Sequence, residues 1–135
     1  MDRKRILIVD DDEDLVRILG VNLMSEGFYV STAFDGMSAV MRAHKDLPDL
    51  IILDIKMPAG DGFSVVEKLR LSAKTFSIPI IFLSALPKED MEDKALAAGA
   101  LRYFSKPFDM DVLVTCIKDN LRVEQQASVP APYTS

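Results

Sequence analysis

The chain carries consecutive acidic residues directly after a short apolar run at 6–9, and the acids are Asp10, Asp11, Asp12, Glu13 and Asp14. Packed carboxylates at the end of a buried strand repel one another, so a positive partner at that point would relieve the repulsion. Carboxylate oxygens are ligands for hard divalent cations such as Mg²⁺. The acidic run therefore predicts half of a metal site.

Three further apolar runs also end in polar residues that suit phosphate chemistry. The run at 50–53 ends in Asp54, the run at 80–83 in Ser84, and the run at 101–105 in Lys106. If these runs are parallel strands of one sheet, their carboxyl ends share the edge at which open α/β sheets bind ligands. We expect acids, a hydroxyl and an ammonium group to meet there.

The chemistry of these groups suggests a role for each. Asp11 and Asp54 can bind Mg²⁺ or Mn²⁺ directly, Asp10 can hold a water on the metal, and the backbone carbonyl of Lys56 can complete the protein's ligands. With charge repulsion masked, Asp54 can attack a phosphoryl group in line while Lys106 and Ser84 stabilise the equatorial oxygens. The product would be an aspartyl phosphate.

Each residue also has a purely structural interpretation. An aspartate after a strand is commonly a helix N-cap, Ser84 could simply end a strand, and Lys106 could be a solvated loop lysine. Capping does not explain Asp54, Ser84 and Lys106 together, so the joint pattern favours the phosphate site.

Strand-like and helix-like segments alternate along the chain, which predicts an α/β fold with a doubly wound five-stranded parallel sheet and five helices. Strands are expected at 5–9, 29–33, 50–53, 78–83 and 101–105. Helices are expected from about 12 to a C-cap at Gly27, at 36–44, after 62, at 88–98 and from 109. The helix at 88–98 has a small apolar face of Met91, Ala95 and Ala98, so we expect it to be the most mobile.

Length and composition limit the classes of protein that the chain can represent. The 135 residues, 49% of them hydrophobic, suit one domain, which we place at 4–123, with a disordered tail or the start of a linker at 124–135. A net charge of −5 without a basic cluster argues against direct nucleic-acid binding. No run is long enough for a membrane span, and a single cysteine fits a cytoplasmic location.

The chain resembles response-regulator receiver domains of two-component signalling. The match rests on Asp10-Asp11 as the acidic pair, Asp54 as phosphoacceptor, Ser84-Ala85, Lys106-Pro107, and the loop with Met57-Pro58 and Gly60-Asp61-Gly62. These motifs occur in the family's order and cover about residues 4–123. The resemblance implies a flavodoxin-like sheet of order 2-1-3-4-5, which is already known for a chemotaxis member of that family, and a cis peptide bond before Pro107.

The resemblance also implies a function. A sensor histidine kinase or histidine phosphotransfer protein would donate the phosphoryl group in a Mg²⁺-dependent reaction, and the domain would catalyse only its own phosphorylation and dephosphorylation. Ser84 would then move toward the phosphoryl group and Tyr103 would turn inward, switching the surface of the 88–98 helix, the fifth strand and the last helix. That surface would control a downstream protein or a missing effector domain, and could form a phosphorylation-dependent homodimer. Lys56 and Leu86 occupy positions that affect phosphoryl lifetime, and Leu86 offers no group to orient water.

Three other functions remain as alternatives. Asp10-x-Asp12 and Ser84 resemble haloacid-dehalogenase-type phosphatases with Asp10 as nucleophile, but Asp14 stands where that family prefers Thr or Val. A flavin- or nucleotide-binding module would place glycine and hydroxyl residues, not acids, against a phosphate. A pure interaction module would have no need of the complete set of site residues. The kinase, the output target, the phosphoryl lifetime and the oligomeric state are open from sequence.

Overall fold

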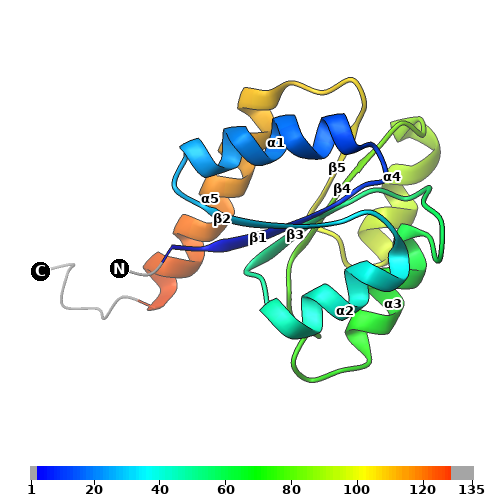
Figure 1. Ribbon diagram of the computed structural model, residues 1–135, viewed down its shortest axis with the longest axis horizontal. Helices are drawn as coiled ribbons and strands as arrows, with labels where there is room; N and C mark the ends of the chain where they lie inside the picture. Colours follow the sequence, from blue (N-terminus) through cyan, green and yellow to red (C-terminus); the bar gives the residue numbers. More distant parts are fainter. Residues whose placement is uncertain (1–2, 129–135) are drawn as a thin grey trace, which may run out of the picture.

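A central parallel sheet organises the molecule in the computed structural model, which describes residues 3–128, with side chains described up to residue 121. The described residues form strands β1 (Arg5–Val9), β2 (Tyr29–Ala33), β3 (Leu50–Leu53), β4 (Ile80–Ser84) and β5 (Arg102–Ser105). Every adjacent pair is parallel, and the order is β2-β1-β3-β4-β5 (Figure 1). The predicted fold class and strand order are confirmed.

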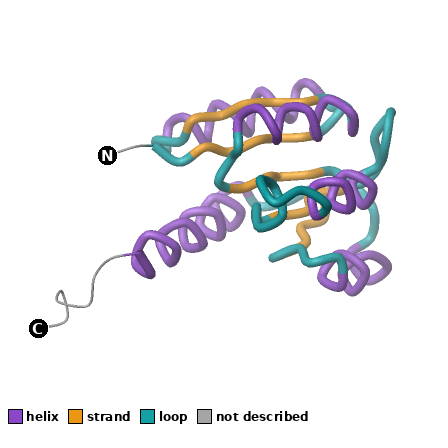
Figure 2. Tube along the Cα trace, turned by 90° about the horizontal axis from the view of Figure 1, so that it is seen from below, coloured by secondary structure: helices purple, strands orange, loops and turns teal. Residues whose placement is uncertain are grey.

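Helices cover both faces of the sheet (Figure 2). They are α1 (Glu13–Ser25), α2 (Gly36–Asp46), α3 (Gly62–Arg70), α4 (Lys88–Ala97) and α5 (Met110–Ser128). Buried side chains of α1 and α5 share one core cluster with β1, β3 and β4, whereas those of α2, α3 and α4 pack into a second cluster on the other face. A doubly wound sheet buries its central strands in this way, which is why β3 is apolar at all of its positions.

Four helices begin after an aspartate that the sequence places directly before them. Asp12, Asp35, Asp61 and Asp109 precede α1, α2, α3 and α5, and each side chain accepts a hydrogen bond from the backbone N–H three residues later. A cap of this kind stabilises a helix by about 1 kcal/mol. The capping interpretation is therefore right for Asp12, which was one of the acids in the run.

Several predicted boundaries differ from the structure. β4 begins at Ile80 rather than at 78, because Pro79 has no N–H to donate to a neighbouring strand. The strand ends at Ser84, one residue later than expected. The C-cap of α1 is Glu26, and Gly27 follows it with a φ of 97°, a conformation that glycine adopts at little cost. In α3, Val65 is buried and Phe63 is half-buried.

The last helix extends further than the sequence pattern indicates. α5 continues to Ser128, so the first residues of the predicted tail at 124–135 are helical. The apolar stripe ends at Leu121, and this loss of periodicity is the reason why sequence reasoning ended the helix early. The remaining residues of the predicted tail, 129–135, lie outside the described part of the chain.

Candidate functional site

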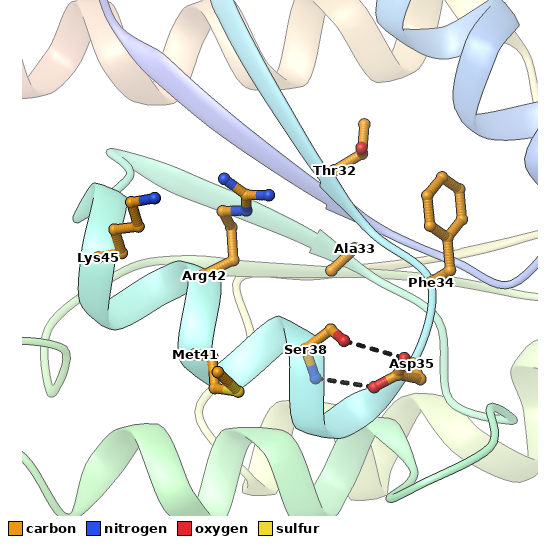
Figure 3. Close-up of a pocket in the computed structure, with 8 residues that line it drawn as sticks. All are labelled: Thr32, Ala33, Phe34, Asp35, Ser38, Met41, Arg42 and Lys45. Atoms are coloured by element: carbon orange, nitrogen blue, oxygen red, sulfur yellow. Dashed lines mark hydrogen bonds between the residues drawn. The ribbon is translucent and has the colours of Figure 1, made fainter.

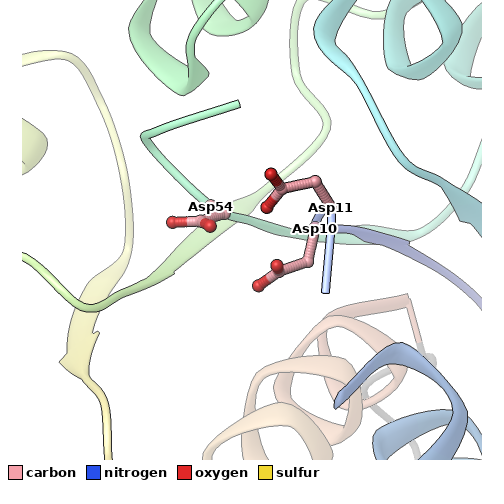
Figure 4. Close-up of side chains that lie close together, drawn as sticks. All are labelled: Asp10, Asp11 and Asp54. Carbon is pink, nitrogen blue, oxygen red and sulfur yellow. The ribbon is translucent and has the colours of Figure 1, made fainter. Parts of the chain in front are cut away.

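The carboxylates of Asp10, Asp11 and Asp54 converge at the carboxyl edge of the sheet (Figure 4). Asp10 follows β1 and Asp54 follows β3, and the register that pairs Val9 with Leu53 brings these two ends together. One carboxylate oxygen from each of the three residues lies within 4.8 Å of the others. Asp10 and Asp54 are buried, whereas Asp11 is exposed.

Hydrogen bonds from the backbone hold the two buried carboxylates in place. The N–H of Ile55 donates to Asp54 Oδ1 at 2.7 Å, and the N–H of Asp12 donates to Asp10 Oδ1 at 2.9 Å. Burial raises the pKa of Asp54, and the charge of Asp10 raises it further, against the opposing effects of Lys106, Ile55 and Ser84. Because the charge of Asp10 contributes to this rise, a cation placed in the cluster would favour the ionised form of Asp54.

Lys106 reaches the same cluster from the end of β5. Its Nζ donates to Asp10 Oδ2 at 2.7 Å and lies 3.5 Å from Asp54 Oδ2. Burial by itself would lower the pKa of Lys106, but the hydrogen bond and charge of Asp10 together with the charge of Asp54 outweigh burial and raise it. The peptide bond between Lys106 and Pro107 is cis, as the resemblance implied.

Ser84 and Tyr103 are joined through the backbone of Leu86. The Leu86 N–H donates to Ser84 Oγ at 3.2 Å, and the Tyr103 hydroxyl donates to the Leu86 carbonyl at 2.7 Å. Tyr103 is only 2% exposed, so this strand tyrosine faces the core rather than the solvent. Burial raises the pKa of Tyr103, which keeps the hydroxyl protonated as the donor of this bond.

The loop after β3 packs tightly against Asp54. Lys56 lies in that loop, two residues after Asp54, with an exposed side chain. A Cβ at Gly62 would collide with the Asp54 carbonyl, while the Gly62 N–H donates to the Ile55 carbonyl at 2.8 Å. Glycine at 62 therefore allows α3 to start directly over the site residue.

The structure separates the acidic run into two groups. Asp10 and Asp11 belong to the carboxylate cluster, whereas Asp12 caps α1 and Asp14 forms an exposed ion pair with Arg17 at 2.6 Å. Sequence reasoning missed the structural role of Leu86, whose backbone links Ser84 with Tyr103. Backbone groups leave no signal in residue type, so only the geometry could reveal this link.

Comparisons with known proteins agree with this geometry. Residues 6–118 match the family model of the response regulator receiver domain. The chain therefore belongs to the receiver-domain family of two-component response regulators.

Two curated relatives and one solved structure illustrate the match. The response regulator PleD of Caulobacter vibrioides is 44% identical over 82% of this chain, and the transcriptional regulatory protein PrrA of Mycobacterium leprae is 45% identical over 87% of it. The chain spans only 24% of PleD and 50% of PrrA. The chemotaxis protein CheY4 of Vibrio cholerae is 29% identical, with a TM-score of 0.80 over 87% of this chain and 98% of that chain.

These comparisons bear on the phosphatase alternative that the sequence left open. They place the chain in a family of phosphoacceptor signalling domains and do not support the haloacid-dehalogenase alternative with Asp10 as nucleophile. Among the residues that the structure describes, no helix combines the length and the apolar character that crossing a membrane requires.

Proposed function

We propose that Asp54 accepts a phosphoryl group from a phosphohistidine of a sensor histidine kinase or a histidine phosphotransfer protein. The observation that carries this proposal is the position of the Asp54 carboxylate, which is buried, lies 3.5 Å from the Lys106 ammonium group and shares its site with two further carboxylates. A buried carboxylate with a raised pKa and specific charged partners is typical of a functional residue.

The reaction exchanges one bond to phosphorus for another. A carboxylate oxygen of Asp54 forms the new P–O bond while the P–N bond of the phosphohistidine breaks. The leaving imidazole keeps the electron pair of that bond and takes up a proton. Lys106, already at the Asp54 carboxylate, lies where it can stabilise charge on the transferred oxygens, and the Ser84 hydroxyl provides a second donor at the neighbouring strand end.

The donor set fits Mg²⁺ or Mn²⁺. Asp10, Asp11 and Asp54 offer hard oxygen ligands within 4.8 Å of one another, and we assign the backbone carbonyl of Lys56 as a further ligand. When bound, the cation offsets the carboxylate charge and the charge of the phosphoryl oxygens. Burial is the first cause of the raised pKa of Asp54 and the charge of Asp10 the second, and a bound cation would offset both effects.

Ser84 and Tyr103 form the switch in this proposal. The Ser84 hydroxyl moves toward the phosphoryl group and gives up its bond with Leu86, and the loop after β4 shifts with it. Tyr103 already faces inward and bonds the Leu86 carbonyl, so its contribution is to hold the shifted loop rather than to turn in from solvent. This differs from our expectation that Tyr103 turns inward upon phosphorylation.

The surface of α4, β5 and α5 carries the output in this proposal. It controls a downstream protein, an effector domain outside this chain, or a phosphorylation-dependent homodimer. PrrA, whose name describes a transcriptional regulator, is twice as long as the matched region, which supports an effector that lies beyond a receiver domain at 4–123. In this view the domain catalyses only its own phosphorylation and dephosphorylation, acts in the cytoplasm, and leaves any nucleic-acid contact to another domain.

Acetyl phosphate with Mg²⁺ tests the proposal. Intact mass should increase by one phosphoryl group, and peptide mapping should place the modification on Asp54. Asp54→Asn should not be modified, whereas Asp14→Asn, which alters an exposed acid outside the cluster, should be modified like the wild type. An unmodified wild type, or a phosphoryl group on Asp10, would overturn the proposal.

A further inference from the structure

The outer edge of β2 is an unprotected strand edge. Within residues 3–128, β1 is the only strand that pairs with β2. The strand Tyr29–Ala33 contains neither a charged residue nor a proline, which are two of the devices by which natural edge strands avoid pairing with other chains. Backbone groups of residues 29 and 33 bond to the β1 side, so the alternation of the strand directs those of Val30 and Thr32 outward.

Open hollows lined by both apolar and charged side chains flank this edge on both faces of the sheet. On the α2 face, a hollow of about 580 Å³ includes Phe34 and Met41 in its lining (Figure 3). On the α1 face, a hollow of about 410 Å³ includes Val21 and Met24. Met41 is 67% exposed and Val21 57% exposed, which is high for large apolar side chains. Both hollows could take side chains from a strand added to β2.

The two ends of β2 carry opposite charge. The surface hollow at its amino end is lined by four basic and two acidic side chains, namely Arg3, Lys4, Arg5, Lys45, Asp46 and Asp49. At its carboxyl end, Asp35 follows the strand directly, and the adjacent hollow is lined by Glu13, Asp14 and Arg17. Arg17 pairs with Asp14, so Glu13 and Asp35 leave this end with net negative charge. A strand that binds this edge favourably therefore runs antiparallel to β2 and carries the same charge pattern.

We propose that a second copy of this chain binds at this edge, with the two β2 strands antiparallel about a two-fold axis at Ser31. An antiparallel copy places its basic end against the acidic end of the first, and the same patch serves both copies, which closes the dimer. A parallel copy would place like charges together. The chain's own surface thus satisfies the charge pattern that the edge requires.

The position of the axis follows from the outward backbone groups. With the axis at Ser31, Val30 of each copy lies opposite Thr32 of the other, and each such pair exchanges both N–H···O bonds. Ser31 lies opposite Ser31 of the second copy in a pair without backbone hydrogen bonds, in which Cα atoms are about 4.5 Å apart. The result is one continuous sheet through both copies.

This dimer is independent of the phosphorylation proposal. β2 and β5 lie at opposite edges of the sheet, so pairing through β2 leaves the surface of α4, β5 and α5 accessible in both copies. The dimer should form without a phosphodonor, and its failure would leave the assignment of Asp54 untouched. With a short strand as its centre, it belongs to the small, weak class of protein interfaces and needs a high protein concentration.

Disulfide trapping tests the position of the axis. In a Cys116→Ser background, Ser31→Cys should form a dimer on oxidation with copper phenanthroline, because a Cα separation of about 4.5 Å suits a disulfide. Tyr29→Cys, also on the edge strand, is the matched control, because positions 29 of the two copies would be about 13 Å apart. A Ser31→Cys protein that stays monomeric, or equal trapping of both variants, would overturn the proposal.

Sedimentation of the unmodified protein provides the second measurement. The wild type should shift from monomer to dimer as its concentration approaches the millimolar range, and Thr32→Lys should abolish the shift because it places a charge on the strand edge. Leu71→Lys alters an apolar side chain that is 83% exposed and lies beyond α3, and should dimerise like the wild type. A wild type that is monomeric at every concentration would exclude the second copy and favour an extended peptide of another protein. A Thr32→Lys variant that is folded by circular dichroism and still dimerises would place the interface elsewhere.

Discussion

Helices α1 and α4 both follow a strand that ends in a site residue, yet they are held very differently. α1 begins after the acidic pair, and its N-cap Asp12 accepts a hydrogen bond from the Leu15 N–H at 3.2 Å. It buries Val16, Leu19 and Leu23 against the sheet. Each of these side chains stabilises the folded state by about 1.5–3 kcal/mol when removed from water.

α4 follows Ser84 and has much less to hold it. Its N-cap is Pro87, whose side chain has no group that could accept a hydrogen bond, and of its ten residues, all of which the structure describes, only Ala95 is buried. One exposed contact also holds α4, because Lys94 Nζ lies 4.4 Å from the centre of the Phe63 ring. Such a contact contributes about 0.5–1 kcal/mol.

The difference in packing between α1 and α4 implies that the two ends of the site have different roles. The carboxylates depend on β1, β3 and a firmly packed α1, so their positions should change little when the site is loaded. Ser84 leads into a helix whose docking on the sheet is weak, and a bias of a few kcal/mol is enough to shift a two-state element of that kind. Our expectation that the helix at 88–98 is the most mobile stays a prediction.

Truncation of one inward-facing side chain in each helix tests whether α1 and α4 contribute unequally to the stability of the fold. Leu19→Ala should lower the free energy of unfolding by about 2–5 kcal/mol, because it leaves a cavity under α1. Met91→Ala in the half-buried face of α4 should lower it by less than about 1 kcal/mol. Urea denaturation measures both, and equal losses would contradict the account.

Metal affinity should depend on the acids of the cluster and not on acidic charge in general. Asp11→Asn should weaken Mg²⁺ binding by about tenfold or more, since it replaces a charged oxygen ligand by a neutral one. Asp14→Asn is the matched control, because it removes an equal charge from the first turn of α1 outside the cluster. Isothermal titration would decide, and equal effects of the two substitutions would mean that the ion binds diffusely.

Leu86 lies at the junction between the site and α4 and should affect how long the phosphoryl group persists. Its side chain packs partly against the core near α4 and offers no polar group to an attacking water. Leu86→Glu should therefore accelerate loss of phosphate several-fold, as general-base groups do. Loss of label from the two proteins can be followed in parallel. An unchanged rate would remove this explanation of phosphoryl lifetime.

The smallest expected effect is on the stability of the metal-free protein. Asp54 ionises at an ordinary pKa of 3.8 when unfolded and at a higher pKa when folded, so the folded state binds more protons between these values. The free energy of unfolding should fall as the pH rises through this window. Asp54→Asn should flatten that fall and be at least as stable as the wild type near neutral pH.

Urea denaturation in EDTA from about pH 4 to about pH 8 checks this expectation. Addition of Mg²⁺ should reverse the order of the two proteins, since the ion stabilises only the form that binds it. Equal pH profiles of the wild type and Asp54→Asn in EDTA would contradict this expectation.

Much of this architecture could be predicted because it depends on residue type and spacing. The apolar run at 50–53 favours a strand buried on both faces, and the polar residues that end parallel strands meet at one edge of the sheet. Asp10, Asp11, Asp54 and Lys106 meet there as expected.

The rest could not be predicted because it depends on backbone groups and on packing in three dimensions. The bond between Tyr103 and the Leu86 carbonyl uses an acceptor that every residue possesses. The part of α5 beyond Leu121 lies outside the apolar periodicity. The charge pattern along the edge of β2 arises from residues that are distant in sequence.

The most direct test of the central claim is phosphorylation of the wild type by acetyl phosphate in the presence of Mg²⁺ and in the presence of EDTA. If the carboxylate cluster holds a cation that lets Asp54 accept a phosphoryl group, modification of Asp54 should be strong with Mg²⁺ and nearly absent with EDTA. Equal modification under both conditions would contradict the account.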